Sequence, residues 1–478
     1  MTAFTTTSAS LPLTFASALD AIEKVAAGQR TAGRHENAAI SVPLDRAVGR
    51  TAARNHTNPE PTPRYDTSAM DGFAVRSAAT ANASPKAPVR LRIAGSIAAG
   101  DDPSRQILQL GDGHDTLDDA NVGSESCVEI MTGGIFPPQF DACIKVEDVI
   151  FCPAEAQHIL VTKPIAPDTN KRFRASDIPK HDILVKAGET IRLSHILPLA
   201  SAGLTSVSVA PRPRVGILST GKELVQRSRD TGQHDVNGPY LTAAATSAGA
   251  KAKFLGVIDD EPEELHEKLH DAVSPGAEER YDVVITSGAV SKGRHDHVRD
   301  VLEKMGAEII FHGLAIRPGH PVLFALLKAP DSDARTAFFG LPGNPGAAAA
   351  CFRFLVVPYL RTLRGQEREK FIPARLVGMA AEGTMASNSK CAGKVMDCFR
   401  HGVLSALPGE GLGVEVSPEQ SPAKLRPYKS VNCWVHFEYG PGRAGVSGAD
   451  MVKCYPFSPA TDFPATEEEG ITGEAWRE

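Results

Sequence analysis

Positive charge is not in surplus in this chain. Its 478 residues contain 51 Lys and Arg against 57 Asp and Glu, which gives a formal net charge of −6. This balance argues against a protein that holds nucleic acid through a broadly basic surface. An anionic ligand must therefore meet donors that are gathered locally in a pocket.

Long apolar runs are also scarce. No uninterrupted run reaches the roughly 18 residues that a membrane helix needs. The first basic residue is Lys24, so the charged start of a signal peptide and an arginine-rich transit peptide are both missing. The sequence thus predicts a cytoplasmic protein that does not enter a membrane.

The cysteines form no CxxC pair and no Cys/His cluster at zinc spacing. Scattered thiols of this kind indicate reduced, structural residues. The eight are Cys127, Cys143, Cys152, Cys351, Cys391, Cys398, Cys433 and Cys454.

Strand-like and helix-like segments alternate in the middle of the chain. From residue 213, "RVGILST", "KAKFLGVID" and "YDVVITSGA" have the apolar character of buried strands, and each is followed by helical spacing. Such alternation predicts a parallel, doubly wound sheet. Residues 80–165, and a second region from Phe371, are β-rich instead, so the expected fold class is α/β plus β-rich domains.

The loops after the parallel strands are the places to search for a ligand site. One is "SGAVSKGRHD" at 287–296, which precedes a helix and suits an oxyanion or phosphate. Asp296 could hold a divalent metal, or it could be only the N-cap of the helix. The loop's turn glycines, hydroxyls and charged groups are Ser287, Gly288, Ser291, Lys292, Gly293, Arg294, His295 and Asp296.

Three further loops allow both a binding role and a structural role. "LPGNPG" at 341–346 lets a ligand approach closely, or merely packs a helix on the sheet. In "LAIRPGHPVLF", Arg317 and His320 form an anion clamp or lie solvated in a loop. In "STGKEL", Glu223 is a metal ligand or only a partner of a helix dipole.

Six motifs, taken in order, resemble the molybdopterin molybdenumtransferases, which include the bacterial MoeA proteins and the E domains of gephyrin and its plant counterpart. The resemblance covers roughly residues 15 to 440. The motifs are "SAMDGFAV" (68–75), "IMTGGIFPPQFDACIKVED" (130–148), "ILSTGKEL" (217–224), "ITSGAVSKGRHD" (285–296), "IRPGHPVLF" (316–324) and "GLPGNPGAAAACF" (340–352).

The resemblance implies an elongated MoeA-like subunit in a homodimer, with an active cleft between the α/β domain and a β-rich domain of the partner subunit. The α/β domain would be similar to MogA and MoaB. The implied divisions are a discontinuous helical and linker domain I (14–79 and 166–211), a β-rich domain II (80–165), the α/β domain III (212–367), a C-terminal β domain IV (370–440) and a flexible tail (441–478).

The resemblance also implies the reaction. Molybdate would be inserted into adenylated molybdopterin with release of AMP, assisted by Mg²⁺ or another divalent cation and without a protein nucleophile. A MogA-type adenylyltransferase could deliver the substrate, since the chain contains a single βαβ array.

Site residues carry over from the family by position in these motifs. The metal and pyrophosphate would be held by Asp296 and Glu223, with Asp71 and Thr132 contributed across the dimer. The implied catalytic residues are Asp71, Thr132, Asp177, Glu223 and Asp296. The implied substrate-binding residues are Ser68, Ser219, Thr220, Gly221, Ser287, Gly288, Ser291, Lys292, Gly293, Arg317, Pro318, Gly319, His320, Pro342, Gly343, Asn344 and Pro345.

The chain departs from the family pattern at several of these places. "KPGKP" becomes "RPGHP", and the departures elsewhere are Ala175, Ser176, Lys222, Ala289, Ala347, Arg400 and His401. Three hypotheses therefore stay open: an insertase that uses Arg and His as oxyanion donors, a related enzyme that acts on another nucleotide or anionic small molecule, and a noncatalytic scaffold.

Overall fold

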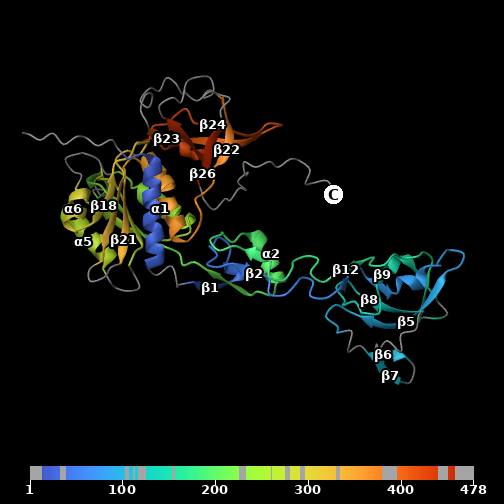
Figure 1. The fold of residues 1–478 in the computed structure, drawn as a ribbon. Coiled ribbons are helices and arrows are strands. Elements are labelled where there is room, and N and C mark those ends of the chain that lie inside the picture. Colours follow the sequence, from blue (N-terminus) through green and yellow to red (C-terminus); the bar gives the residue numbers. More distant parts are fainter. Residues whose placement is uncertain are drawn as a thin grey trace, which may run out of the picture.

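The chain forms an elongated molecule with an α/β domain at one end, a small linker unit in the middle and a β-rich domain at the other end (Figure 1). A β-barrel packs beside the α/β domain. The computed structural model describes residues 13–32, 39–102, 107–110, 113–116, 125–152, 155, 157–225, 233–259, 261–274, 280–290, 297–329, 334–378, 396–439 and 451–457.

The α/β domain contains a six-stranded sheet in the order β16-β15-β17-β21-β20-β18. The first four strands are parallel, and β20 runs antiparallel to both of its neighbours. The expected parallel sheet is therefore confirmed, with one reversed strand. The strands are β15 (Arg214–Thr220), β16 (Lys251–Ile258), β17 (Val283–Ser287), β18 (Glu308–His312), β20 (Leu323–Lys328) and β21 (Arg335–Leu341).

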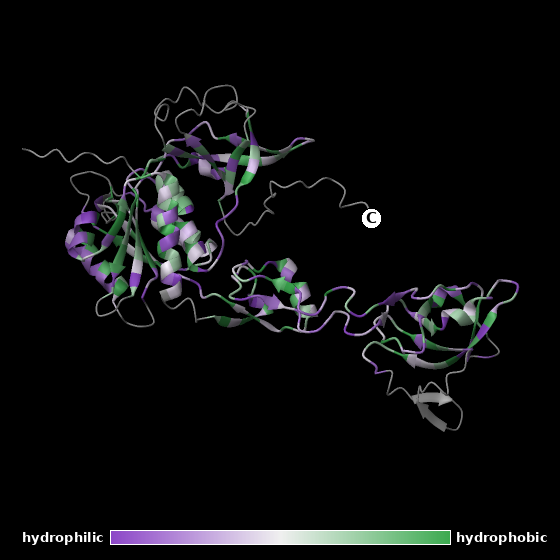
Figure 2. Ribbon diagram, in the orientation of Figure 1, coloured by the Kyte–Doolittle hydropathy of each residue, from purple (hydrophilic) through white to green (hydrophobic). Residues whose placement is uncertain are grey.

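Two apolar clusters cover the two faces of this sheet, which is why β17 is buried along its whole length. Figure 2 shows the hydrophobic strands inside more polar helices. The helices are α1 (Phe15–Ala32), α3 (Lys222–Val225), α4 (Asn237–Ser247), α5 (Pro262–Val273), α6 (Val298–Lys304), α7 (Pro345–Cys351) and α8 (Val357–Leu363).

Helices α7 and α8 are joined by a π-helical turn, Phe352–Val356. The joined segment Pro345–Leu363 is long and apolar enough by composition to cross a membrane, although Arg353 and Arg361 interrupt its apolar residues. It is 83% buried inside the protein, as the core helix of a folded domain is. Pro345 starts it at a position where no backbone donor is needed.

The C-terminal barrel closes because β23 pairs with both β24 and β25, at opposite ends of the order β23-β24-β22-β26-β25. Its last strand corrects one expectation, because Met451–Pro456 falls in the segment predicted to be a flexible tail. The strands are β22 (Ile372–Val377), β23 (Met396–Leu407), β24 (Gly411–Val416), β25 (Cys433–Tyr439) and β26 (Met451–Pro456), and β19 (Ile316–Arg317) of the preceding domain adds to β23.

The β-rich domain has a six-stranded sheet in the order β10-β11-β5-β8-β4-β9. Its strand β4 lies before residue 80, so the sheet begins earlier than the predicted boundary. The strands are β4 (Gly72–Val75), β5 (Val89–Ile97), β8 (Ser126–Ile130), β9 (Ala142–Lys145), β10 (Val149–Phe151) and β11 (His158–Val161). A hairpin of β6 (Ile107–Leu110) and β7 (Gly113–Thr116) adjoins it.

Segments far apart in the chain meet in the linker unit. Strand β1 (Ile40–Pro43) pairs with β14 (Ser206–Val209), and β2 (His56–Thr57) pairs with β13 (Ile183–Val185). Helix α2 (Leu193–Ser201) covers their core. Strands β3 (Thr67–Ser68) and β12 (Lys171–Arg172) connect this unit to the β-rich domain.

Candidate substrate cleft

The ends of three parallel strands form a polar cradle. Ser219 on β15 lies opposite Ser287 on β17, which in turn lies opposite Leu341 on β21. The N–H of Gly288 donates to the Leu341 carbonyl at 3.0 Å, and the Thr220 hydroxyl donates to the Ser287 carbonyl at 3.3 Å. The predicted residues of these three loops are therefore brought to one edge of the sheet.

Asn237 ties this cradle together and was not predicted from the sequence. Its Nδ2 donates to the Ser287 hydroxyl and to the Gly343 carbonyl, both at 2.7 Å. Asp235 starts helix α4 by accepting the N–H groups of Asn237 and Gly238, each at 3.0 Å. The Asp-x-Asn-Gly string is a turn and cap signal that could have revealed the residue.

Two buried hydroxyls beneath the cradle lack partners. Among the described residues, Ser219 Oγ and Thr286 Oγ1 make no hydrogen bond although both side chains are fully buried. An unpartnered buried hydroxyl costs about 1–3 kcal/mol. The edge of the sheet at the cradle therefore contains two hydroxyls whose hydrogen-bonding capacity is unmet among the described residues.

Gly288 is required by the backbone here. Its φ of +108° favours glycine, and an added Cβ would lie 2.6 Å from the Thr220 carbonyl oxygen. Ala289 beside it also has positive φ, +50°, at the place where the family pattern has a second glycine. The alanine preserves the loop conformation but strains it.

A cleft of 590 Å³ lies beside the cradle, between the α/β domain and the barrel. The α/β domain contributes both proline-rich turns, and the barrel contributes Arg400 and the loop 418–422. The predicted residues that line it are Arg317, Pro318, Gly319, His320, Pro342 and Asn344. Pro345 starts α7 next to them.

The charges in this cleft favour an anion. Arg317 is exposed, and Arg400 Nε is buried with no hydrogen-bond partner in the part of the chain that the structure describes. The one carboxylate in the lining, Glu419, is neutralised by Lys424 at 2.6 Å, and that bond lowers its pKa. His320 Nδ1 donates to the Leu314 carbonyl at 2.5 Å, which leaves only Nε2 for a ligand.

His401 lies behind Arg400, in a buried aromatic group. Its ring is 5.0 Å from Tyr428 and 6.0 Å from Trp434. Burial, and then the charge of Arg400, lower the pKa of His401 to about 4. His401 is therefore neutral near pH 7 and adds no charge to the cleft, whereas Arg400 does.

Asp71 and Thr132 form a separate site in the β-rich domain. The backbone N–H and the hydroxyl of Thr132 both donate to Asp71 Oδ1, at 2.6 and 2.7 Å, and these bonds lower the pKa of Asp71. Ser68 is buried and donates to the Met70 carbonyl at 2.7 Å, so it holds the loop. Their loops adjoin strands β4 and β8 of the β-rich domain, which lies at the opposite end of the molecule from the α/β domain (Figure 1).

The other predicted site residues are not seen in the cradle, in the cleft or beside Asp71 and Thr132. Asp177 is exposed in the linker unit, where its N–H donates to the Thr62 carbonyl at 3.1 Å. The backbone of Glu223 lies in α3, but its side chain is outside the described part. Ser291, Lys292, Gly293 and Asp296 also lie outside the described residues.

A further pattern, "HEKLH" at 266–270, matches a zinc-protease motif on helix α5. His266 and His270 are exposed, with ring centroids 6.4 Å apart. They have no third ligand among the described His, Cys, Asp and Glu side chains. The pattern therefore does not form an active site here.

Comparison with known proteins agrees with this arrangement. Residues 13–203 match the MoeA N-terminal region (domain I and II), and residues 216–362 match a probable molybdopterin binding domain. The chain is 32% identical to the molybdopterin molybdenumtransferase of Synechococcus elongatus over 82% of this chain and 89% of that protein. It is 31% identical to that of Haemophilus influenzae over 87% and 93% of the two chains.

A solved structure, the molybdopterin biosynthesis MoeA protein from Pyrococcus horikoshii, has a TM-score of 0.69 and 26% identity. The match covers 94% of this chain and 99% of that one. The elongated, multidomain architecture is thereby confirmed. The protein belongs to the molybdopterin molybdenumtransferase family.

Proposed function

We propose that this protein inserts molybdenum into adenylated molybdopterin and releases AMP, as a transferase of molybdenum cofactor biosynthesis. The observation that carries the proposal is the pairing of two neighbouring sites: the donor-rich ends of β15, β17 and β21, and the cleft that contains Arg317. The cradle suits the pterin and pyrophosphate, and the cleft suits molybdate. Both fit substrates that carry negative charge.

Binding in this scheme depends on charge neutralisation. Arg317 and Arg400 would hold the oxyanion from opposite walls of the cleft, and guanidinium groups keep their charge at any physiological pH. The Gly288 turn would bring backbone N–H groups close to the pyrophosphate. Asn237 would hold the loops after β17 and β21 together around the pyrophosphate through its bonds to Ser287 and Gly343.

Asp296 and Glu223 are the residues that would hold Mg²⁺, whose preferred ligands are carboxylate oxygens. The metal would neutralise charge that develops as the pyrophosphate bond breaks. Support comes from topology, because their loops follow β17 and β15, which are parallel neighbours. The two loops therefore leave the same edge of the sheet.

A homodimer would complete the site with Asp71 and Thr132 of the second subunit. The linker unit separates the β-rich domain, which contains these residues, from the α/β domain and barrel that form the cleft (Figure 1). Helix α2 also exposes Leu193 by 75% and Leu197 by 78%, and residues four apart share a helix face. An apolar pair of this kind is typical of a covered interface.

The direct test is to incubate the purified protein with adenylated molybdopterin, molybdate and Mg²⁺. AMP release should depend on molybdate, and the product should reconstitute a molybdoenzyme apoprotein. AMP release without molybdate would support a related enzyme with another substrate. Binding without AMP release would support a scaffold.

The dimer has its own test, in which two inactive variants, Asp71→Asn and Asp296→Asn, are unfolded together and refolded. Half of a statistical mixture is heterodimer with one intact composite site, so about a quarter of the activity should return. No recovery would place both residues in one subunit's site. The double variant Leu193→Glu/Leu197→Glu should shift the mass by light scattering from dimer to monomer, whereas Val403→Glu on the barrel should not.

A further inference from the structure

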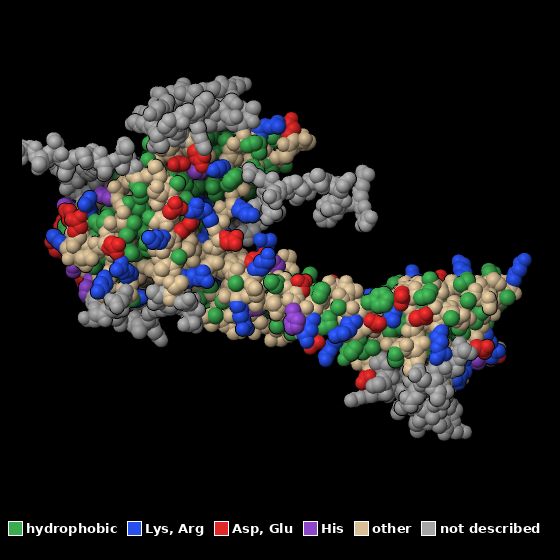
Figure 3. Space-filling view, viewed as in Figure 1, with side chains coloured by type: hydrophobic (Ala, Val, Ile, Leu, Met, Phe, Trp, Pro, Cys, Tyr) green, Lys and Arg blue, Asp and Glu red, His purple; other side chains and the backbone are tan. Residues whose placement is uncertain are grey.

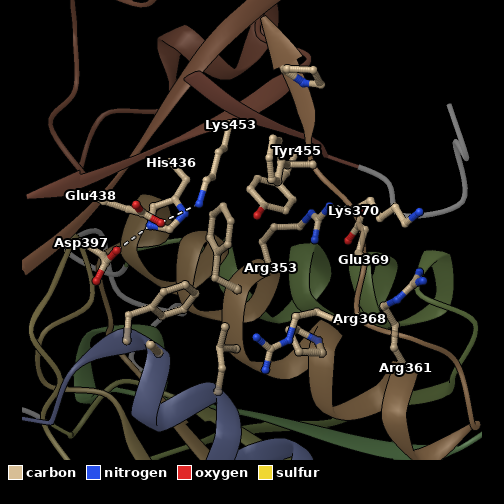
Figure 4. Close-up of a pocket in the computed structure, with 17 residues that line it drawn as sticks. Arg353, Arg361, Arg368, Glu369, Lys370, Asp397, His436, Glu438, Lys453 and Tyr455 are labelled. Atoms are coloured by element: carbon tan, nitrogen blue, oxygen red, sulfur yellow. Dashed lines mark hydrogen bonds and ion pairs between the residues drawn. The ribbon is translucent and has the colours of Figure 1, made fainter. Parts of the chain in front are cut away.

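A second cavity, of 650 Å³, lies at another part of the junction between the α/β domain and the barrel. Helices α1 and α8 line one side, and strands β23, β25 and β26 line the other (Figure 4). The two cavities have no lining residue in common. Strand β23 lies between them and contributes Asp397 to this cavity and Arg400 to the first cleft.

Most of the cations in this cavity are already neutralised. Arg353 pairs with Glu369 at 2.7 Å, and Arg368 pairs with Glu23 at 2.6 Å. Lys453 pairs with Glu438, also at 2.7 Å. These three cations are therefore less available to an anion than Arg317 and Arg400 of the first cleft.

Its distinctive feature is a group of one histidine and two carboxylates on one face of the barrel. His436 and Glu438 are two residues apart on β25, so their side chains lie on the same face of the strand. Asp397 on β23 lies directly opposite Glu438. One ligand atom from each of the three side chains lies within 4.8 Å of the others. His436 Nε2 is 2.6 Å from Asp397 Oδ1.

His436 is held rigidly in this position. Its side chain is only 5% exposed. Its ring centroid lies 5.3 Å from that of Phe15 and 5.0 Å from that of Phe399, which fixes the ring plane from both domains. A metal ligand that is fixed by packing loses little conformational entropy on binding.

We propose that Asp397, His436 and Glu438 bind a divalent transition metal such as Zn²⁺. Mixed nitrogen and carboxylate oxygen ligands suit zinc better than Mg²⁺, which prefers oxygen and retains its waters. Metal–ligand bonds of about 2.0–2.2 Å hold two ligand atoms of a tetrahedral site roughly 3.3 Å apart. Small rotations of the two carboxylates are therefore required, and Asp397 Oδ1 must move away from His436 Nε2, which lies only 2.6 Å from it. The fourth coordination position faces the cavity and takes water or an anionic group.

Lys453 must leave Glu438 when the metal binds. Its side chain is 37% exposed, and its ammonium also lies 5.2 Å from the Phe371 ring, a favourable contact that does not depend on Glu438. Lys453 thus acts as a competing cation that weakens metal affinity. Replacing Lys453 by an uncharged residue should therefore raise the metal affinity.

The test uses the full chain with His266→Gln and His270→Gln, which removes the exposed histidine pair of α5 as a competing zinc ligand. Zn²⁺ is titrated against a chromophoric chelator, and Co²⁺ is added separately to record its visible absorption. One ion should bind per chain. Glu438→Gln or His436→Gln should weaken binding at least tenfold, and Lys453→Met should tighten it.

Glu438 is partly exposed, so its variant keeps the fold even if the buried His436 variant does not. His195→Gln is a matched control, because His195 also lies beside a carboxylate, that of Glu189 at 3.6 Å. Zinc binding that is lost with the α5 histidines, or that is unchanged by Glu438→Gln and Lys453→Met, would overturn the proposal.

Discussion

The two cavities between the α/β domain and the barrel differ in how their charges are balanced. In the 590 Å³ cleft, Arg317 is exposed and Arg400 Nε has no partner in the described structure, while Glu419 is neutralised. In the 650 Å³ cavity, Arg353 and Arg368 are ion-paired, and aromatic side chains make up part of the lining. Arginines that line a cavity therefore indicate an anion site only where their partners are missing.

The largest expected effect comes from removing an arginine from the first cleft, and the matched change in the second cavity is its control. Arg317→Ala should lower molybdate-dependent AMP release about 100-fold, the usual loss for one oxyanion donor. Arg317→Lys should keep most of the activity, since the family pattern has lysine there. Arg368→Ala should leave turnover unchanged, because its guanidinium pairs with Glu23 and Asp20. If steady-state assays showed equal losses of activity for Arg317→Ala and Arg368→Ala, the two cavities would not differ in anion binding.

A second prediction concerns the turn that shapes the first cleft. Gly319 has a φ of +111°, and a Cβ there would lie 2.3 Å from Cys351 Sγ. Gly203 also has positive φ, but a Cβ there meets nothing within 4 Å. Gly203→Ala should cost about 1–2 kcal/mol from backbone strain alone. Gly319→Ala should cost about 1–3 kcal/mol more from overpacking. Urea unfolding would measure both, and equal costs would show that space at Gly319 is not limiting.

The histidine behind the first cleft should make stability depend on pH. The pKa of His401 is lowered to about 4 in the folded protein. As the pH falls below 6.5, this histidine is therefore protonated in the unfolded chain before it is protonated in the folded one. Stability is therefore full above pH 6.5 and falls as the pH drops towards 4. His401→Gln should reduce this loss by about 2 kcal/mol or less, allowing for partial solvent screening. Thermal unfolding at pH 7.5, 6 and 5 would measure it, and parallel curves for the two proteins would contradict it.

The smallest effect is expected at the strained alanines. Ala289 and Ala175 have φ of +50° and +63°, both at positions where the family pattern has glycine. Ala289→Gly should raise the free energy of unfolding by about 1 kcal/mol through relief of this strain. Ala78→Gly, in a 3-10 helix, is the matched control and should not stabilise the protein. A lower midpoint of urea unfolding for Ala289→Gly would show that the alanine is not strained.

Much of the cradle and of the first cleft beside it was predictable, because their residues lie in compact motifs after strands. The loops at 219–221, 287–288 and 342–344 were correctly expected to meet, since parallel strands end at one edge of a sheet. Asn237 was missed because its role depends on a contact across 50 residues, to Ser287. The sequence also predicted the parallel α/β sheet that the structure contains.

The second cavity could not be predicted in this way. Asp397, His436 and Glu438 come from strands whose pairing is visible only in three dimensions, and each has an ordinary sequence context. The "HEKLH" string, by contrast, matches a known motif but has no third ligand among the described His, Cys, Asp and Glu side chains. Strand β26 was overlooked because it follows a Gly-rich segment that is typical of a flexible tail.

The late position of β26 also affects how the protein is made. This strand lies between β22 and β25, so the barrel stays open until residue 456 has left the ribosome. The α/β domain and the β-rich domain are complete long before that, and N-terminal domains generally fold first during synthesis. The nascent chain therefore carries an unpaired barrel edge until β26 has emerged. A nonsense mutation near residue 440 would leave that edge open permanently, in a protein whose other domains are intact.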